Sequence, residues 1–172
     1  FNELIKMLTE PEFNKLQKGK YFNKKYLIGS GFGGSVYKIN NNYVVKKISS
    51  SWKHFKNEFE TTIILSNYNI SPKVIYHSKK KNKFKYYVME KLDYTLYNGL
   101  KNRLFTEYHL GKLKNILLKL NKTKYRHMDL HFSNIMWSNH YNDFRIIDWE
   151  QYYITNNYNN KEYTSLIKRS NY

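Results

Sequence analysis

The spacing of apolar residues predicts a β-rich first half of the chain. Over residues 25–48, the runs KYLIGS, SVYKIN and YVVKKI are rich in β-branched and aromatic residues, which is typical of strands. The polar NNN at 40–42 predicts a tight turn between the last two runs. The runs PKVIYHS at 72–78 and KYYVMEKL at 85–92 predict a hairpin across a lysine-rich turn.

Two helices are expected among these strands. Residues 3–18 place apolar side chains at helical intervals, interrupted by Pro11. Because proline kinks or ends a helix in its interior, we expect one helix, or a helix broken near Pro11, packed on the first sheet. Residues 52–67 suit the second helix, with Ser50 or Ser51 as its cap.

The second half of the chain combines a long helix with short strands. Residues 104–125 suit the helix. Its predicted apolar face consists of Leu110, Leu113, Ile116, Leu117 and Leu120. The segments RHMDLHFSNIMW and FRIIDWE contain short strand-like runs beside polar loops, with SNHYND as the turn. A short helix is expected near 161–169.

This order of elements is an α+β pattern in two domains. We expect residues 1–90 to form a small antiparallel β-sheet with one main helix. We expect residues 91–172 to form a reduced, mostly helical domain. With 172 residues, of which 41% are hydrophobic, the chain is long enough for two small domains that share a cleft.

The chain is strongly basic, with 30 Lys and Arg against 13 Asp and Glu and a formal charge of +17. Such a charge attracts polyanions, nucleotides, anionic membranes and acidic protein substrates. The basic residues are scattered and mostly lysine, so a dedicated nucleic-acid role is not favoured. The abundance of Asn, Lys, Tyr and Ile is typical of AT-rich codons, which indicates a large DNA virus or an AT-rich microbe.

The cysteine content and the lengths of the apolar runs indicate the cellular compartment of the protein. The absence of cysteine excludes disulfides, zinc–thiolate sites and a thiol nucleophile, and it fits a reducing compartment. No run approaches about 20 apolar residues, so we expect no membrane span. We therefore expect a cytoplasmic protein, located in the host cytoplasm or the virion if it is viral.

Glycines cluster between the first two predicted strands, where four of the seven lie at Gly29, Gly31, Gly33 and Gly34. A Walker phosphate loop is excluded, because its lysine does not follow the second glycine. A dinucleotide fingerprint would open a helix, whereas Val36 continues a strand. The pattern that fits is Gly-x-Gly-x-x-Gly-x-Val between two strands, whose backbone can close over phosphates and offer them N–H groups. A flexible hairpin loop is the alternative interpretation.

A lysine and a glutamate could complete a phosphate site. Lys46 lies on the third predicted strand, and alternation along the strand turns Lys47 the other way. Glu58 and Glu60 both lie in the predicted helix at 52–67. We favour Glu58 as the partner of Lys46, because apolar side chains of that helix would pack next to it, and Glu60 stays open.

The second half of the chain contains candidate metal-binding and catalytic side chains. Residues 127–134 read HMDLHFSN, which places His127, Asp129 and Asn134 at the spacing His-x-Asp-x4-Asn. Asp148 follows the strand in RIIDWE. The fourteen residues from 134 to 148 leave room for two short strands and a turn, so Asn134 and Asp148 would lie at one end of a hairpin. Mg²⁺ could bridge them to phosphates there. The alternative is that these side chains only cap turns.

Together these residues make the chain resemble the protein-kinase-like superfamily over about residues 25–150. The resemblance implies a bilobal protein-kinase-like fold with ATP between the lobes. It implies that Lys46 with Glu58 holds the α- and β-phosphates. The residues that would cover the phosphates are Gly29, Ser30, Gly31, Phe32, Gly33, Gly34 and Val36. The residues that would meet adenine are Met89, Glu90 and Leu92.

The same resemblance implies roles for the second half. Asp129 would orient and deprotonate the acceptor hydroxyl. Asn134 and Asp148 would bind Mg²⁺. His131 stands where protein kinases usually place a lysine near the γ-phosphate.

Several residues depart from typical protein kinases. Met128 replaces the usual arginine of the catalytic loop, so we expect no control through an activation-loop phosphate. HMDLH with IDWE resembles aminoglycoside phosphotransferases, whereas the glycine loop and YYVMEKLDYTL resemble protein kinases. Trp149 and Glu150 replace Phe-Gly, which leaves that segment less freedom to flip. Only 24 residues follow Asp148 (172 minus 148), so we expect the usual peptide-docking platform to be missing or supplied by another molecule.

We therefore expect an ATP- and Mg²⁺-dependent phosphotransferase, a minimal serine/threonine protein kinase acting on a protein hydroxyl. A small-molecule kinase of the aminoglycoside or choline type is the alternative acceptor class. A kinase-shaped binding module without catalysis, attached to a partner or to nucleic acid by its basic surface, is the alternative of a different class. Retention of every chemical group favours the enzyme.

Overall fold

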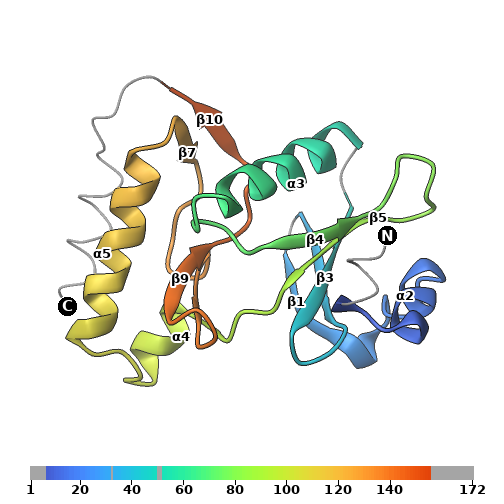
Figure 1. Cartoon of the computed structure of the whole chain (residues 1–172), viewed down its shortest axis with the longest axis horizontal. Coiled ribbons are helices and arrows are strands. Elements are labelled where there is room, and N and C mark those ends of the chain that lie inside the picture. The colour runs from blue at the N-terminus through green and yellow to red at the C-terminus, as the bar shows by residue number, and fades with distance from the viewer. Residues whose placement is uncertain (1–6, 32, 50–51, 156–172) are drawn as a thin grey trace. The chain divides into compact units, whose positions relative to one another are not determined.

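The computed structural model describes residues 7–31, 33–49 and 52–155. The chain forms two compact units, shown in Figure 1. The first unit comprises residues 1–63 and 73–91, and the second comprises 64–72 and 92–172. The segment 64–72 belongs with the second unit because Leu65 and Ile70 are buried in its core.

The first unit is built on a five-stranded antiparallel sheet in the order β1-β2-β3-β5-β4. The strands are β1 (Leu27–Gly31), β2 (Gly34–Lys38), β3 (Tyr43–Ile48), β4 (Val74–His77) and β5 (Lys85–Glu90), and a short 3₁₀ helix, η1 (Lys24–Tyr26), precedes them. The side chain of Asn40 accepts hydrogen bonds from the N–H groups of Asn42 and Tyr43, both at 2.9 Å, which closes the predicted NNN turn. The predicted α+β class and the predicted hairpins of this sheet are confirmed.

The first fully described helix of this unit, α2 (Glu10–Gln17), begins at Glu10, so Pro11 lies in its first turn and not in a helix interior. Thr9 caps it, with the Thr9 N–H donating to Glu12 Oε2 at 2.8 Å. Proline is tolerated in this first turn because its missing N–H would have no partner inside the helix. Leu16 of α2 is buried in the same apolar cluster as Val45 of the sheet.

The second helix, α3 (Trp52–Ser66), packs on the sheet through apolar side chains. Phe55 and Phe59 are buried with Val44, Tyr87 and Met89. Residues 50 and 51, where the sequence predicts the cap, lie outside the described residues. The packing fixes the face of α3 that carries Glu58, which is 1% exposed.

The described part of the second unit is mixed, where the sequence predicts mostly helix. Its helices are α4 (Leu96–Lys101) and α5 (Glu107–Asn121). Its strands form two small sheets: β6 (Tyr94–Thr95), β8 (Ile135–Ser138) and β9 (Asp143–Ile146) in the order β6-β8-β9, and β7 (Tyr125–His127) with β10 (Tyr152–Ile154). The sequence did not predict α4 or β6, and the helix predicted near 161–169 lies outside the described residues.

The long helix α5 is shorter than the predicted 104–125, and one predicted core residue is wrong. Leu113, Ile116, Leu117 and Leu120 are buried as expected, but Leu110 is 38% exposed. At about 100° per residue, Leu110 lies at the edge of the arc that the four buried side chains share. Over the described residues, no helix has the length and apolar character needed to cross a membrane.

Candidate functional site

The glycines form the turn of the β1–β2 hairpin in the first unit. Gly31 pairs with Gly34 across the hairpin, and Gly29 and Ser30 lie exposed on β1. Gly33 lies in the turn, Val36 follows on β2, and Phe32 is outside the described residues. A Cβ added at Gly34 would collide with the backbone carbonyl oxygen of Lys47 on β3, whereas nothing lies within 4 Å of one added at Gly29 or Gly31. Gly34 is therefore required for packing, and Gly29 and Gly31 leave open space above the strand.

We expect Gly34→Ala to lower the free energy of unfolding by about 1–3 kcal/mol, because β2 must move away from β3 to admit the methyl group. Gly29→Ala and Gly31→Ala are the matched controls and should each change it by less than about 1 kcal/mol. Urea unfolding followed by circular dichroism measures all three. Equal losses in the three variants would contradict the assignment of Gly34 to close packing.

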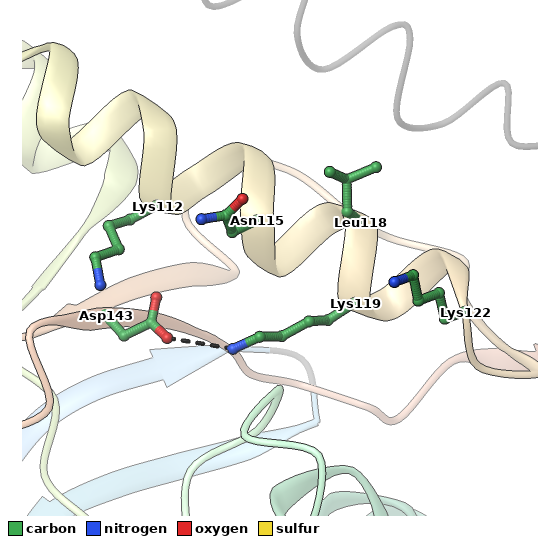
Figure 2. Close-up of a pocket in the computed structure, with 6 residues that line it drawn as sticks. All are labelled: Lys112, Asn115, Leu118, Lys119, Lys122 and Asp143. Atoms are coloured by element: carbon green, nitrogen blue, oxygen red, sulfur yellow. Dashed lines mark ion pairs between the residues drawn. The ribbon is translucent and has the colours of Figure 1, made fainter.

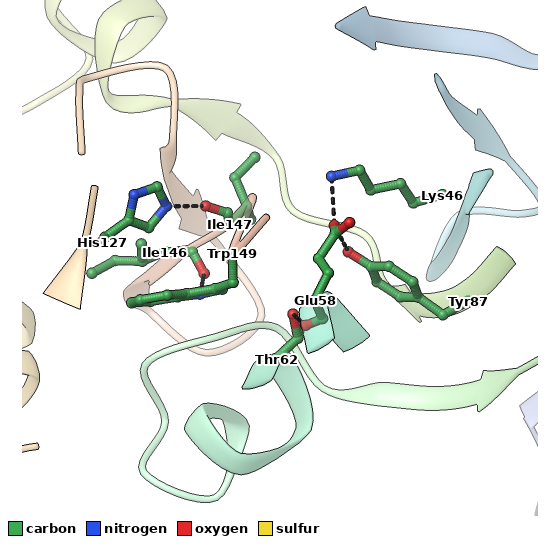
Figure 3. A network of polar contacts seen from close by, with 8 residues as sticks. All are labelled: Lys46, Glu58, Thr62, Tyr87, His127, Ile146, Ile147 and Trp149. Atoms are coloured by element: carbon green, nitrogen blue, oxygen red, sulfur yellow. Dashed lines mark hydrogen bonds and ion pairs between the residues drawn. The ribbon is translucent and has the colours of Figure 1, made fainter. Parts of the chain in front are cut away.

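A buried ion pair lies beside this hairpin. Lys46 pairs in register with Val36 on one side and Tyr87 on the other. Its Nζ lies 2.6 Å from Glu58 Oε1, and the two side chains are 9% and 1% exposed. Figure 3 shows the pair together with Tyr87, whose hydroxyl donates to Glu58 Oε1 at 2.8 Å. Glu58 is thus the partner that the sequence favoured.

The neighbouring charged residues, Glu60 and Lys47, do not take part in this ion pair. Glu60 lies on the exposed side of α3, 3.7 Å from Lys56. Lys47 points away from Lys46, with its Nζ 5.1 Å from the ring centroid of Phe84. The alternation that the sequence predicts for β3 therefore holds. Tyr87 was missed by sequence reasoning; its signal is the β3–β5 register, which places it directly across from Lys46.

The predicted adenine-contacting residues follow along β5 and the segment after it. Met89 is 7% exposed and packs with Val44 and Phe55. The N–H of Glu90 donates to the carbonyl of Lys73 at 3.0 Å. Leu92, 8% exposed, belongs to the second unit. Met89 and Glu90 thus lie at the end of the strand that carries Tyr87.

His127 is the buried anchor of the loop 127–134 in the second unit. Its Nε2 lies 2.9 Å from the carbonyl oxygen of Ile147, and its Nδ1 accepts the N–H of Asp129 at 3.1 Å. The proton of the neutral ring therefore sits on Nε2. Burial lowers the pKa of His127, against the opposing effects of the Ile147 carbonyl and the Asp148 carboxylate. His127 therefore stays neutral near pH 7 and holds the loop by two hydrogen bonds, the first of which is drawn in Figure 3.

The loop carries three of the four predicted catalytic residues: Asp129, His131 and Asn134. The Asn134 amide Nδ2 donates to the backbone carbonyl of Asp129 at 2.9 Å, and Asn134 is 7% exposed. This bond directs the amide nitrogen and leaves Oδ1 as the oxygen suited to a cation. The Asp129 side chain is 63% exposed, with Oδ2 3.6 Å from His131 Nε2. The Asp129 carboxylate is therefore accessible to a solute, while hydrogen bonds to His127 and Asn134 hold the Asp129 backbone.

The segment of Asp148 is tied to the same loop. The N–H of Ile147 donates to the carbonyl of Asn134 at 2.9 Å. Asp148 has a φ of 66°, in the left-handed region that non-glycine residues seldom adopt and that often marks functional positions. Trp149 is fully buried against the ring of His127, and its Nε1 donates to the Ile146 carbonyl at 3.0 Å, as Figure 3 shows.

The two predicted metal ligands, Asn134 and Asp148, thus come from segments that share a backbone hydrogen bond. Within the described ranges, no group of three or more His, Cys, Asp or Glu side chains is arranged to hold a metal ion. An amide oxygen and a carboxylate are a hard oxygen pair of the kind that Mg²⁺ accepts, usually with phosphate oxygens and waters completing its shell. The residues therefore fit a magnesium ion that arrives with a phosphate ligand.

The predicted residues fall into two groups, one in each unit. The first contains the glycine hairpin, Lys46 and Glu58, and the second contains His127 to Asn134 and Asp148. No protein-family model matches this chain, and no curated protein matches it either.

Proposed function

We propose that the protein is a Mg²⁺- and ATP-dependent phosphotransferase of the protein-kinase-like type. The observation that carries this proposal is the buried Lys46–Glu58 pair beside the glycine hairpin. A buried ion pair is a poor source of stability, because desolvation offsets much of the attraction between its charges. A lysine fixed in this way is suited to hold an anion at a defined place, and the exposed backbone of Gly29 and Gly31 supplies a surface for phosphates.

In this proposal each unit supplies part of the chemistry of phosphoryl transfer. Lys46 binds the α- and β-phosphates, and Glu58 and Tyr87 keep its ammonium group in place. Asn134 Oδ1 and Asp148 would hold Mg²⁺, and the ion would supply positive charge that offsets the negative charge of the phosphates. The neutral His127 and the buried Trp149 position the loop and the Asp148 segment without touching the substrate.

The proposed reaction is an in-line transfer. The acceptor oxygen attacks the γ-phosphorus and forms a new P–O bond, while the bond from that phosphorus to the β–γ bridging oxygen breaks and ADP leaves. Asp129 orients the acceptor hydroxyl and takes its proton. Positioning and cation electrostatics supply most of the rate enhancement.

We propose a protein serine or threonine hydroxyl as the acceptor. The glycine hairpin and the segment YYVMEKLDYTL support this class, since both resemble protein kinases. A small-molecule hydroxyl is the second candidate, and the specific observation that favours it is His131, whose Nε2 lies 3.6 Å from Asp129 Oδ2. Phosphorylation of carrier proteins, compared with phosphorylation of aminoglycosides and choline, distinguishes the two classes.

Thermal unfolding with nucleotide tests the proposal. Mg-ATP at about 100 times its dissociation constant should stabilise the wild type by about 2.7 kcal/mol. Asp148→Ala should abolish the part of this stabilisation that requires Mg²⁺, and chelation with EDTA should do the same to the wild type. Glu107→Gln, a carboxylate change in the first turn of α5, is the control and should respond like the wild type. A full response to Mg-ATP in Asp148→Ala would refute the proposed metal site.

A further inference from the structure

A basic groove lies in the second unit, and no residue of the loop 127–134 lines it. It has a volume of about 280 Å³ and is formed by α5 and the first residue of β9. Its lining residues are Lys112, Asn115, Leu118, Lys119, Lys122 and Asp143. In Figure 2, Lys112 and Lys119 reach from α5 toward Asp143. None of these residues has a role in the proposed phosphotransfer.

The charges of this groove are unbalanced. Asp143 is its one acidic lining residue, against three lysines. Asp143 Oδ2 already lies 3.5 Å from Lys119 Nζ and 3.7 Å from Arg145 Nη1. The single carboxylate is therefore shared by two cations, and Lys112 and Lys122 add positive charge that it does not offset. The groove is suited to an anionic ligand.

The polar residues of the groove form a row along α5. Lys112, Asn115, Lys119 and Lys122 are separated by three, four and three residues, which places them on one side of α5. At 1.5 Å per residue, the ten-residue interval from Lys112 to Lys122 spans about 15 Å. An extended peptide covers this length with about four or five residues. A short run of acidic side chains therefore matches the length over which the lysines are distributed.

We propose that this groove binds an Asp/Glu-rich segment of a separate protein. The lysines would pair with its carboxylates, and the Asn115 amide can both donate to and accept from a peptide backbone. A second copy of the chain is a poor occupant, because each copy carries a formal charge of +17. The residues 156–172 are a poor occupant as well, since they contain Lys161, Lys168 and Arg169 against Glu162.

Nucleic acid fits the groove less well than an acidic peptide. Sites for single-stranded nucleic acid combine basic residues with aromatic side chains on which bases stack. None of the six lining residues is aromatic. The acidic segment also deepens the proposed function, on which this further step rests: it would belong to the protein substrate and recruit it to the kinase.

Fluorescence anisotropy with a fluorescein-labelled Asp/Glu-rich peptide of about twelve residues tests the groove directly. At about 0.15 M salt, Lys112→Glu/Lys122→Glu should weaken binding about tenfold or more, and this variant keeps the Lys119–Asp143 pair. The control is Lys80→Glu/Lys81→Glu in the exposed β4–β5 turn, which makes the same change in net charge. It should weaken binding by about twofold or less.

Three results would overturn the proposal. The first is the absence of peptide binding by the wild type. The second is equal weakening by the groove and control variants, which would assign binding to net charge alone. The third is competition in which a single-stranded RNA of matched charge displaces the peptide and is itself lost in the groove variant, which would assign the groove to nucleic acid.

A second measurement separates this inference from the proposed function. Asp129→Asn should bind the acidic peptide like the wild type, because Asp129 does not line the groove. If groove-dependent binding is found and no phosphotransfer is detected, the groove stands and the proposed function fails. If phosphotransfer is detected, a serine peptide with an acidic segment should show about tenfold higher KM and unchanged kcat with the groove variant. An unchanged KM would refute substrate recruitment.

Discussion

Asp129→Asn is expected to lower the rate of phosphoryl transfer by about 10²–10⁴-fold, the usual contribution of a positioned general base. The amide cannot take the proton of the acceptor hydroxyl, although it has nearly the same shape as the carboxylate. Transfer of radiolabelled phosphate from ATP to the protein itself and to carrier proteins measures the change. Binding of Mg-ATP should be retained, because Lys46, Asn134 and Asp148 are unchanged.

Asp129→Asn should change the chemistry of the side chain without changing the conformation of the loop. The hydrogen bonds that hold Asp129 in the loop use its backbone: its N–H donates to His127, and its carbonyl accepts from Asn134. The side chain is 63% exposed, so the loop should keep its conformation in the variant. Glu60→Gln makes the same acid-to-amide change on the exposed side of α3 and serves as the control. Equal turnover by Asp129→Asn and wild type would remove Asp129 from the mechanism.

The strands of the first unit could be predicted from sequence because each signal is local. Alternating β-branched residues and the Asn40 turn specify the hairpin between β2 and β3 without information from elsewhere in the chain. Pro11 shows the limit of such reasoning, since the same proline breaks a helix interior and is tolerated in a first turn. The position of the Thr9 cap decides between these outcomes.

Burial in the second unit was harder to predict, because it depends on contacts between segments that are distant in the sequence. Leu110 follows the apolar periodicity of α5 but lies at the edge of its buried arc, and which edge is covered depends on packing partners. Leu65 at the end of α3 joins the core of the second unit, although Phe55 and Phe59 of the same helix pack on the first sheet. Periodicity identifies apolar faces, but it does not tell which core each face joins.

Within the candidate site, too, some residues follow from local sequence signals and others depend on contacts between distant segments. Lys46 was found because strand alternation and the glycine pattern both pointed to it. Tyr87 was missed because its role depends on the register between β3 and β5, which pairs it with Lys46 across the sheet. The buried His127 belongs to a motif, but its tautomer follows only from the Ile147 carbonyl and the Asp129 N–H that surround it.

Lys46→Met is expected to lower the free energy of unfolding by about 3–5 kcal/mol, because it removes the ammonium group that lies 2.6 Å from the buried Glu58 carboxylate. Glu58 is 1% exposed, so water cannot replace the lost partner at low cost. The Tyr87 hydroxyl, 2.8 Å from Glu58 Oε1, offers one hydrogen bond but no charge. Urea unfolding followed by tyrosine and tryptophan fluorescence measures the loss.

The same helix supplies a matched control. Lys56→Met breaks the pair with Glu60, whose side chains are 54% and 48% exposed, and should change stability by less than about 1 kcal/mol. A double variant, Lys46→Met/Glu58→Leu, should recover much of the loss, since two apolar side chains leave no uncompensated charge. If the double variant is instead as unstable as the sum of its single changes, the pair acts through packing rather than charge. Recovery of stability without recovery of the Mg-ATP response would mean that Lys46 is kept buried to bind phosphate and not to hold the fold together.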